Sequence, residues 1–264
     1  MKYLSALFII GILTSMPAPL QAADNNGFIL QYSPLETAFV PMLMGILGIG
    51  AVVLCFRFFY SQRTKIILRQ RQEYKEVAGQ IMSVAADMVD FKDELIQGHS
   101  RRVADYAMLI GQRLGMTENE LETLYYAAML HDIGKVCIPD SILNKNGPLT
   151  KEEFDVVKRH VVVGADLLRD INVMGDIALG AKYHHERIDG KGYADGISGD
   201  EIPLIAKIIG VCNAFDSMLY NKPYKKGMSI ERVQSEFIAN AGTQFDERVT
   251  AVLISLINQG DVQA

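Results

Sequence analysis

Five histidines constrain the fold of this chain more than any other feature of its sequence. The 264 residues contain no others, and each stands beside polar, ligand-type or small residues rather than inside a plain apolar run. They are His99, His131, His160, His184 and His185. Neutral imidazole and carboxylate together suit a divalent transition-metal ion. A fold that brings these distant segments together would therefore build a metal site.

The segment 131–135 reads His-Asp-Ile-Gly-Lys and sets two types of metal ligand side by side. Neighbouring residues on a helix point about 100° apart, so both can reach one metal cluster only from the side or the end of that helix. In that arrangement Asp132 would bridge two ions while His131 binds one. His184 and His185 form a second doublet, which favours a metal site over the alternative of solvated surface residues. A histidine without such a neighbour is more typical of an ordinary core or surface position.

Basic residues near these histidines indicate an anionic substrate. Lys135 follows His131 by four residues, so one helical turn would bring its ammonium to the same side, where it suits a phosphate oxygen. The alternative is that Lys135 is an ordinary surface lysine. Arg187, Lys222 and Lys225 extend the same basic rim. Metals beside a basic rim indicate a phosphorylated substrate. The net charge of −5 gives no support to a nucleic-acid surface, which would need a basic stripe.

The segment 189–196 contains three glycines in eight residues. Glycine permits positive φ and a close approach of the backbone to other groups. The segment is therefore either a flexible connector between helices or a shaped loop at the mouth of the site. In the second interpretation the loop presents Gly192 and Tyr193 for interaction.

Helical spacing of apolar residues continues from Gly98 to the end of the chain and predicts an all-α domain. Two capping boxes, Thr117–Glu120 and Thr150–Glu153, each begin a helix. The first of these helices would deliver the His-Asp doublet at its C-terminal end. Further helices are expected over 176–186, over 202–219 with Asn213 and Asp216 one turn apart, and from near Ser229 and Asp246. The sequence contains neither an alternating strand pattern nor an internal repeat.

The N-terminal part of the chain has the layout of a membrane anchor. Residues 1–23 combine Lys2, an apolar run and a small-residue stretch, which is typical of a signal peptide or an uncleaved signal anchor. Residues 24–36 then form a short external segment. Residues 37–56 carry no charge and supply about the twenty positions that a membrane helix needs. A buried core helix is the alternative for this segment.

Positive charges that follow the apolar segment predict its orientation. Six basic residues lie between Arg57 and Lys75, and the positive-inside rule then places everything after Phe56 in the cytoplasm. We therefore expect a single pass through the inner (cytoplasmic) membrane, with a cytoplasmic domain over 93–264. Residues 57–92 are predicted to form a long helix that is a stalk, a dimerising coil or both. Within it, residues 61–92 are expected to hold a parallel homodimer, because the membrane helix already fixes the direction of both chains.

The motifs resemble those of a known family. The segment 131–135 looks like the HD motif of the HD superfamily of metal-dependent phosphohydrolases. The run 184–187, with Asp189-Gly190 and Gly192-Tyr193, is similar to the HHE and GYP signatures of the HD-GYP subfamily. The linking segments 138–140, 149–153, 202–203 and 223–224 match as well, and the likeness runs from about residue 87 to 258.

This resemblance implies an HD-type helical bundle that hydrolyses cyclic di-GMP to linear pGpG or GMP at a centre of two or three metal ions, often iron or manganese. The family's metal-ligand positions fall on His99, His131, Asp132, His160, His184 and His185, with Asn213 at a further ligand position. Lys135 matches the lysine near the scissile phosphate, and it is expected to act with Asp132 in catalysis. Asp216, Lys222 and Lys225 match positions near the nucleotide. The Gly-Tyr-Ala loop would be a surface for a diguanylate cyclase partner.

Four departures from the family pattern shape these expectations. The family has an aspartate where this chain has Asn213, the proline of GYP is Ala194, and Lys222 stands where an arginine is usual. Leu95, one turn before His99, cannot supply the extra carboxylate of three-metal members, so we expect two metal ions. The substitution at Asn213 keeps two alternatives open. They are a weakened domain that acts as a cyclic-dinucleotide receptor or protein-interaction module, and a hydrolase of another cyclic dinucleotide.

Overall fold

The computed structural model describes residues 34–93, 97–171, 176–220 and 227–262. The predictions for residues 1–33, Leu95, Lys222 and Lys225 lie outside these ranges. The chain divides into two units, Met1–Arg71 and Gln72–Ala264. In the described ranges, regular structure is helical and the only β pairing is an isolated bridge between Ala241 and Phe245. The prediction of an all-α fold is confirmed.

The first helix of the described chain, α2, runs without interruption from Pro34 to Lys92. It covers both the predicted membrane segment 37–56 and the predicted stalk 57–92. Its first part is long and apolar enough to cross a membrane by length and composition, and none of that apolar stretch is buried. The helical state of these residues agrees with the sequence, while the membrane assignment stays a prediction.

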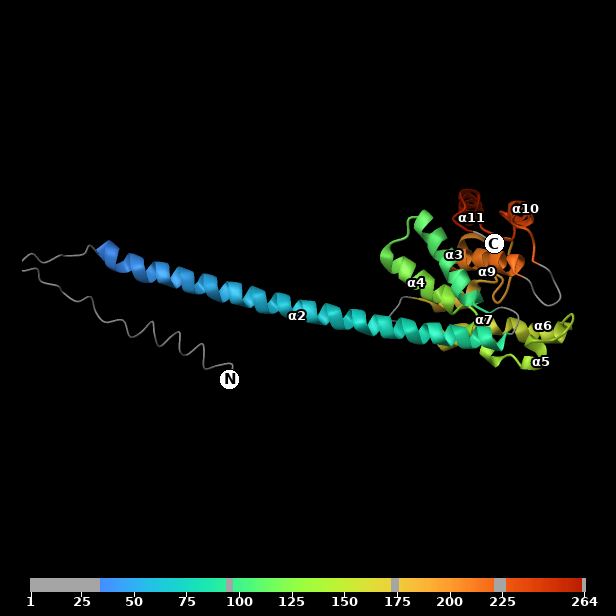
Figure 1. The fold of residues 1–264 in the computed structure, drawn as a ribbon, viewed down its shortest axis with the longest axis horizontal. Helices are drawn as coiled ribbons and strands as arrows, with labels where there is room; N and C mark the ends of the chain where they lie inside the picture. Colours follow the sequence, from blue (N-terminus) through green and yellow to red (C-terminus); the bar gives the residue numbers. More distant parts are fainter. Residues whose placement is uncertain (1–33, 94–96, 172–175, 221–226, 263–264) are drawn as a thin grey trace, which may run out of the picture. The chain divides into compact units, whose positions relative to one another are not determined.

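The second unit is a bundle of short helices, of which α3, α4 and α9 lie side by side (Figure 1). Beyond the end of α2 its elements are α3 (His99–Arg113), α4 (Glu118–Met129), the 3-10 helix η1 (Ile133–Cys137), α5 (Asp140–Leu143), α6 (Lys151–Lys158), α7 (His160–Leu168), α8 (Ala178–Tyr183), the 3-10 helix η3 (Gly199–Glu201), α9 (Leu204–Leu219), α10 (Ile230–Asn240) and α11 (Glu247–Gln259).

The helix starts follow the local signals in the sequence. Both capping boxes are formed, with Thr117 accepting from the backbone of Glu120 and Thr150 accepting from that of Glu153. Ser229 and Asp246 are the N-caps of α10 and α11. The side chains of Thr117, Thr150 and Asp246 accept backbone N–H groups that have no partner inside the helix, whereas Ser229 holds the N-cap position without such a bond. The predicted helix starts at these four positions are confirmed.

The helix expected over 176–186 is shorter than predicted. The helix α8 ends at Tyr183, so the two histidines follow the helix instead of ending it. The backbone N–H of Glu186 bonds to the carbonyl of Tyr183, three residues back, at 2.9 Å. This tighter turn replaces the last α-helical turn, as is common where helices end. The prediction of α-helix through Glu186 is therefore wrong by about one turn.

Two glycines allow the close packing that brings the histidine-bearing segments together. A Cβ on Gly134 would lie 2.0 Å from the carbonyl oxygen of His160, so only glycine lets η1 rest on α7. A Cβ on Gly180 would lie 2.7 Å from a methyl of Ile209 and 2.9 Å from that of Ala127. The helix α8 therefore packs directly on α4 and α9, over the fully buried core of the bundle.

Candidate metal centre

All five histidines and Asp132 come together in the second unit, although they lie on segments far apart in the chain. Their donor atoms form two groups in which all the candidate ligand atoms lie within 4.8 Å of one another. The four-residue group consists of Asp132, His160, His184 and His185. The three-residue group consists of His99, His131 and Asp132. Asp132 belongs to both groups.

The carboxylate of Asp132 divides its two oxygens between the groups. Oδ1 lies 3.3 Å from Nε2 of His160 and 3.7 Å from Nε2 of His184. Oδ2 lies 3.3 Å from Nε2 of His131 and 3.9 Å from Nε2 of His99. Each oxygen can thus serve a different ion, which is the geometry of a bridging carboxylate.

Three of the histidines are oriented by backbone carbonyls of the helix that precedes them. The Nδ1–H groups of His131 and His160 donate to the carbonyls of Ala128 and Val157, each at 2.7 Å. His184 donates in the same way to the carbonyls of Gly180 and Ala181, at 3.0 Å. A carbonyl oxygen only accepts, so Nδ1 carries the proton and Nε2 keeps a free lone pair. This is the tautomer that binds a metal through Nε2.

His99 is oriented by a carboxylate. Its Nδ1–H donates to Oδ2 of Asp216 at 2.7 Å, and both residues are almost fully buried. Arg102 holds that carboxylate with two bonds, 2.7 Å from Nε to Oδ1 and 3.0 Å from Nη2 to Oδ2. A carboxylate behind a histidine fixes its tautomer and raises its basicity as a metal ligand.

Two buried polar atoms at the centre of the cluster have no hydrogen-bond partner among the described residues. They are Nε2 of His131 and Oδ1 of Asp132, on side chains that are 0% and 4% exposed. An unpaired buried polar atom costs roughly 1–3 kcal/mol. Both atoms are of types that bind metal ions, and both face the other donors. The residues therefore fit a divalent metal, which would remove this cost.

Burial and charge set the protonation states of the cluster. Burial lowers the pKa of His184 to about 4 and lowers the pKa of His99 and His185 as well, so these imidazoles favour the neutral form that binds metal. Burial alone would raise the pKa of Asp132, but the neighbouring charges, that of Lys135 above all, hold it well below its usual range, and the Asp132 carboxylate in turn raises the pKa of His131 against the effect of burial. Asp132 is therefore ionised and ready to act as a ligand.

Lys135 lies beside the cluster, in η1 rather than in the α-helical turn expected from the sequence. Its Nζ forms ion pairs with Oδ2 of Asp132 at 2.8 Å and with Oδ2 of Asp93 at 3.2 Å. Burial would lower the pKa of Lys135, but these two carboxylates raise it. The ammonium is therefore held charged next to the shared carboxylate.

The end of α2 holds the segment that carries Lys135. Nζ of Lys92 donates to the backbone carbonyls of Val136 and Ile138, at 2.8 and 2.5 Å. The side-chain amide of Asn144 donates in turn to the carbonyl of Lys92 at 3.0 Å. These contacts, with the ion pair of Asp93, tie the last residues of α2 to η1.

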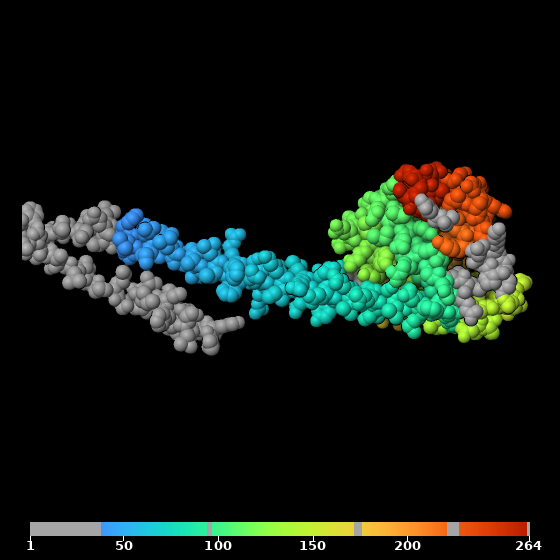
Figure 2. Space-filling view, in the orientation of Figure 1, coloured from blue at the N-terminus to red at the C-terminus, as the bar shows by residue number. Residues whose placement is uncertain are grey.

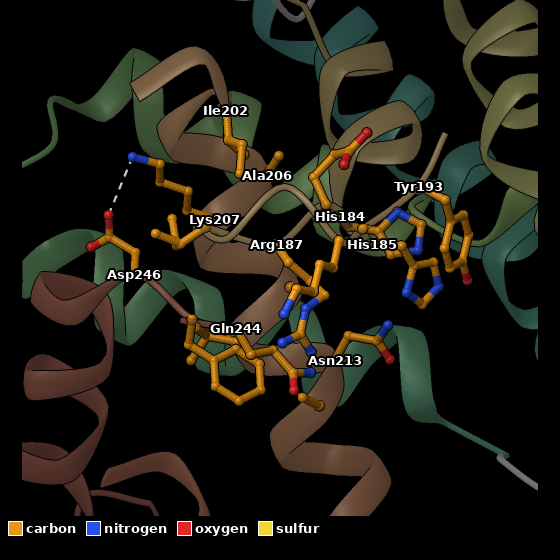
Figure 3. Close-up of a pocket in the computed structure, with 18 of the residues that line it drawn as sticks. His184, His185, Arg187, Tyr193, Ile202, Ala206, Lys207, Asn213, Gln244 and Asp246 are labelled. Carbon is orange, nitrogen blue, oxygen red and sulfur yellow. Dashed lines mark ion pairs between the residues drawn. The ribbon is translucent and has the colours of Figure 1, made fainter. Parts of the chain in front are cut away.

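A pocket of about 550 Å³ opens beside the four-residue group. Figure 3 shows His185 and Tyr193 next to each other, Asn213 and Arg187 nearby, and the ion pair of Lys207 with Asp246 at the other end. The rings of Tyr193 and His185 stack with centroids 4.7 Å apart. The pocket is large enough for a small-molecule ligand, and its lining combines apolar surface with cationic groups.

The glycine-rich segment 189–196 forms a shaped loop beside this pocket. One carboxylate oxygen of Glu186 accepts the backbone N–H groups of Asp195 and Gly196, at 2.8 and 2.9 Å. A Cβ on Gly192 would lie 2.5 Å from the backbone nitrogen of Arg187, so the loop folds closely against its own start. These bonds favour the shaped loop over the flexible connector.

The other candidate site residues lie in different places. Arg187 and Asn213 line the pocket, with Arg187 held by two bonds to Asp189 at 2.9 and 2.8 Å. Asp216 lies behind His99 and is almost fully buried. Asp93 and Arg102 also belong to the site but were not expected from the sequence, since their partners are 42 and 114 residues away in the chain. No local pattern in the sequence indicates contacts over such distances.

The fold and the cluster together define a class of protein, an all-α domain with a histidine–aspartate centre suited to divalent metals. The chain belongs to the HD domain family, whose model matches residues 83–249. The resemblance inferred from the sequence motifs is thereby confirmed.

The chain is similar to several characterised proteins. It is 37% identical over 193 residues to the cyclic di-GMP phosphodiesterase response regulator RpfG of Xanthomonas campestris, which covers 71% of this chain and 50% of the relative. It is 34% identical over 178 residues to the 3'3'-cGAMP-specific phosphodiesterase 3 of Vibrio cholerae, which covers 67% and 39%. A crystal structure of a cyclic GMP-AMP specific phosphodiesterase from V. cholerae shares the fold, with a TM-score of 0.55, 22% identity and coverage of 69% and 49%. The chain thus spans half or less of the length of these proteins.

Proposed function

We propose that this chain is a metal-dependent phosphodiesterase that hydrolyses cyclic di-GMP to linear pGpG, GMP or both. The observation that carries the proposal is the carboxylate of Asp132, whose two oxygens face separate groups of histidines. Two-ion centres of this kind suit the displacement of a phosphate ester oxygen. The similarity to cyclic-dinucleotide phosphodiesterases supports the substrate class.

We propose two divalent transition-metal ions, iron or manganese, one at each group. Imidazole nitrogen and carboxylate oxygen suit such ions, and the unpaired Nε2 of His131 supports a ligand role. His99, His160, His184 and His185 are the other proposed histidine ligands. When bound, the ions would activate a water molecule and neutralise charge on the phosphoryl group. Asn213 offers only a neutral carbonyl oxygen where a carboxylate would add a negative charge.

The residues around the cluster have distinct proposed roles. Lys135, held charged beside Asp132, would stabilise the negative charge that develops on the phosphoryl oxygens. Arg187 lines the pocket and would bind a phosphate or a base edge of the substrate. The assignment of Lys222 and Lys225 to the substrate stays a prediction. The same is true of Asp216, whose burial behind His99 favours instead a role in orienting that histidine.

We propose that the chain is anchored in the inner membrane by residues 37–56, with the metal centre in the cytoplasm. The uncharged, unburied stretch of α2 and the basic residues after Phe56 support this topology. A C-terminal reporter fusion should be active in the cytoplasm, and activity only in the periplasm would contradict the proposal.

The loop 189–196 is the proposed surface for a diguanylate cyclase partner. Lys191, Ala194 and Asp195 on it are exposed, while Glu186 keeps the loop in one shape. Substituting Ala194 with Pro, the residue usual in the family, would test this surface. We expect a changed affinity for the cyclase and an unchanged metal content.

The enzymatic proposal is tested on the full chain in detergent, purified with and without oxygen. We expect about two bound transition-metal ions per chain and hydrolysis of cyclic di-GMP by the metal-loaded protein. Asp155→Ala, which removes an exposed carboxylate from α6, is the matched control and should change neither readout. Tight binding of cyclic di-GMP without hydrolysis, at full metal occupancy, would contradict the proposal.

A receptor without turnover is the second candidate, and the position of Asn213 in the pocket lining favours it. A further alternative is hydrolysis of a different cyclic dinucleotide, as the similarity to a 3'3'-cGAMP phosphodiesterase suggests. Parallel assays with cyclic di-GMP and 3'3'-cGAMP separate these cases. A receptor would bind one of the two cyclic dinucleotides and release no product. A hydrolase of a different cyclic dinucleotide would hydrolyse 3'3'-cGAMP faster than cyclic di-GMP.

A further inference from the structure

One face of α2 within the second unit carries a continuous row of exposed apolar side chains. These residues, called here the α2 stripe, are Tyr74, Val77, Ile81, Val84, Met88 and Phe91, each between 54% and 76% exposed. Figure 2 shows this part of the chain, in turquoise, at the edge of the second unit with one side uncovered. Contiguous exposed apolar surface of this kind marks an interaction site.

The opposite face of the same helix is already buried. Ala86 and Val89 belong to the core of the domain, and Met82 packs against it. The carboxylate of Asp90 accepts the backbone N–H and the hydroxyl of Ser100, at 3.0 and 2.7 Å, and so fixes α2 to the start of α3. The α2 stripe therefore cannot turn into the core of its own domain.

The spacing of the stripe selects the kind of partner. Its residues follow one another at alternating intervals of three and four, which is the a and d pattern of a heptad repeat. Ile81 and Met88 occupy a positions, and Val77, Val84 and Phe91 occupy d positions. Further back the a positions remain apolar, at Ile67 and Tyr60, whereas the d positions become Gln70 and Arg63, so the full seam is confined to residues 74–91. A heptad seam packs against a helix with the same repeat, and a second copy of α2 supplies one.

Charges beside the stripe set the direction of pairing. In this register Glu73 and Asp87 occupy g positions, while the e positions hold Ala78, Ala85 and Lys92. Parallel helices set each g residue against an e residue of the partner, so Asp87 would approach Lys92 of the second copy, whose ammonium would add this contact to its bonds with the carbonyls of Val136 and Ile138. An antiparallel pair would set the acidic g positions against each other. The complementary charges therefore favour parallel helices.

We propose that the α2 stripe is the seam of a parallel two-stranded coiled coil between two copies of this chain. Because each domain packs on the face of α2 away from the stripe, two domains fit on opposite sides of the seam. The predicted stalk dimer thereby gains a register and extends along α2 to Phe91, close to the metal centre. The proposal does not depend on the enzymatic activity.

Cysteine cross-linking of the full chain in membranes tests the seam, with Cys55 and Cys137 changed to serine because both are exposed. Ile81→Cys and Met88→Cys should each form a disulfide-linked dimer, because a positions of a parallel coil face their own copies. Glu76→Cys, an exposed position outside the stripe on the same helix, is the matched control and should cross-link at least roughly tenfold less.

Two results would overturn the proposal. Equal cross-linking of Glu76→Cys and Met88→Cys would show that the α2 stripe is not the contact surface between the two copies. Self-cross-linking at only one of Ile81→Cys and Met88→Cys would exclude the parallel register. Val84→Glu provides a second measurement, since a charge in the seam should shift the protein toward monomers in light scattering while the metal content stays unchanged. A Val84→Glu protein with undiminished dimer mass would also count against the seam.

Discussion

The two ligand groups of the metal centre use the same residue types but are supported differently. The four-residue group has four protein donors, orients His160 and His184 through backbone carbonyls three or four residues back in the chain, and adjoins the pocket. The three-residue group has one donor fewer, and His99 depends on Asp216 from another helix. Because it offers one protein donor more, we expect the four-residue group to hold its ion more firmly, although Asp216 strengthens His99 as a ligand of the other group.

The largest effect is expected where the two groups meet. Asp132→Ala removes a ligand from both groups, so bound metal should fall from about two ions to less than one. Hydrolysis should fall by well over roughly 100-fold, because even residues behind the ligands contribute about 10–100-fold. Metal analysis and a hydrolysis assay check this, beside Asp132→Asn, which preserves the shape of the side chain. Retention of both ions in Asp132→Ala would show that the Asp132 carboxylate does not bridge the two ions.

Single-histidine variants sharpen the difference between the groups. His131→Ala should leave about one ion, which stays bound through dialysis because the four-residue group is intact. His184→Ala should also leave about one ion, but one that dialysis removes, because only the three-residue group remains complete. Metal content before and after dialysis distinguishes the two. Equal retention in both variants would show that the groups do not differ in strength.

Loss of the Asp216 carboxylate behind His99 is expected to have the next largest effect, a loss of metal affinity. Asp216→Asn replaces an acceptor with an amide, so His99 loses the carboxylate that fixes its tautomer. Metal affinity at the three-residue group should fall by about 10–100-fold while the four-residue group is unaffected. Metal titration should then resolve one weakened step. Asp200→Asn, at a fully exposed aspartate, is the control, and an equal loss there would point to a nonspecific cause.

Substitution of Asn213 by aspartate is expected to have the smallest of these effects. Asn213→Asp would add a negative charge beside the cluster and should raise metal affinity and hydrolysis at least about tenfold, or about 1.4 kcal/mol. Titration of both proteins with Mn²⁺ under reducing conditions checks it. Equal affinity and equal turnover would mean that the amide costs nothing, and the receptor alternative would lose its main support.

Local signals account for most of what could be predicted from the sequence. The capping boxes at Thr117 and Thr150 and the caps at Ser229 and Asp246 act within one helical turn, so their helices begin where expected. The histidine doublets are also local, and the structure brings both to one cluster. Helix ends were less predictable, since the tight turn after Tyr183 depends on packing around the loop that follows.

Contacts between distant segments account for what the sequence could not indicate. Asp216 stands one turn after Asn213 in α9, and only the packing of α9 on α3 sets it behind His99. His131 and His160, in contrast, each bond to a carbonyl three residues back, which is a local arrangement. Asp93 meets Lys135 only because α2 ends against η1. Such pairs become visible only in three dimensions.

The end of α2 gives the metal centre a mechanical connection. Lys92 bonds to two carbonyls of the segment after Lys135, at 2.8 and 2.5 Å, and Asp93 holds the lysine itself. A helix that slides by a single residue travels about 1.5 Å along its axis. That travel would stretch such bonds beyond the range in which they count as hydrogen bonds. A piston movement of α2 would therefore either break these bonds or carry the segment around Lys135 along with the helix.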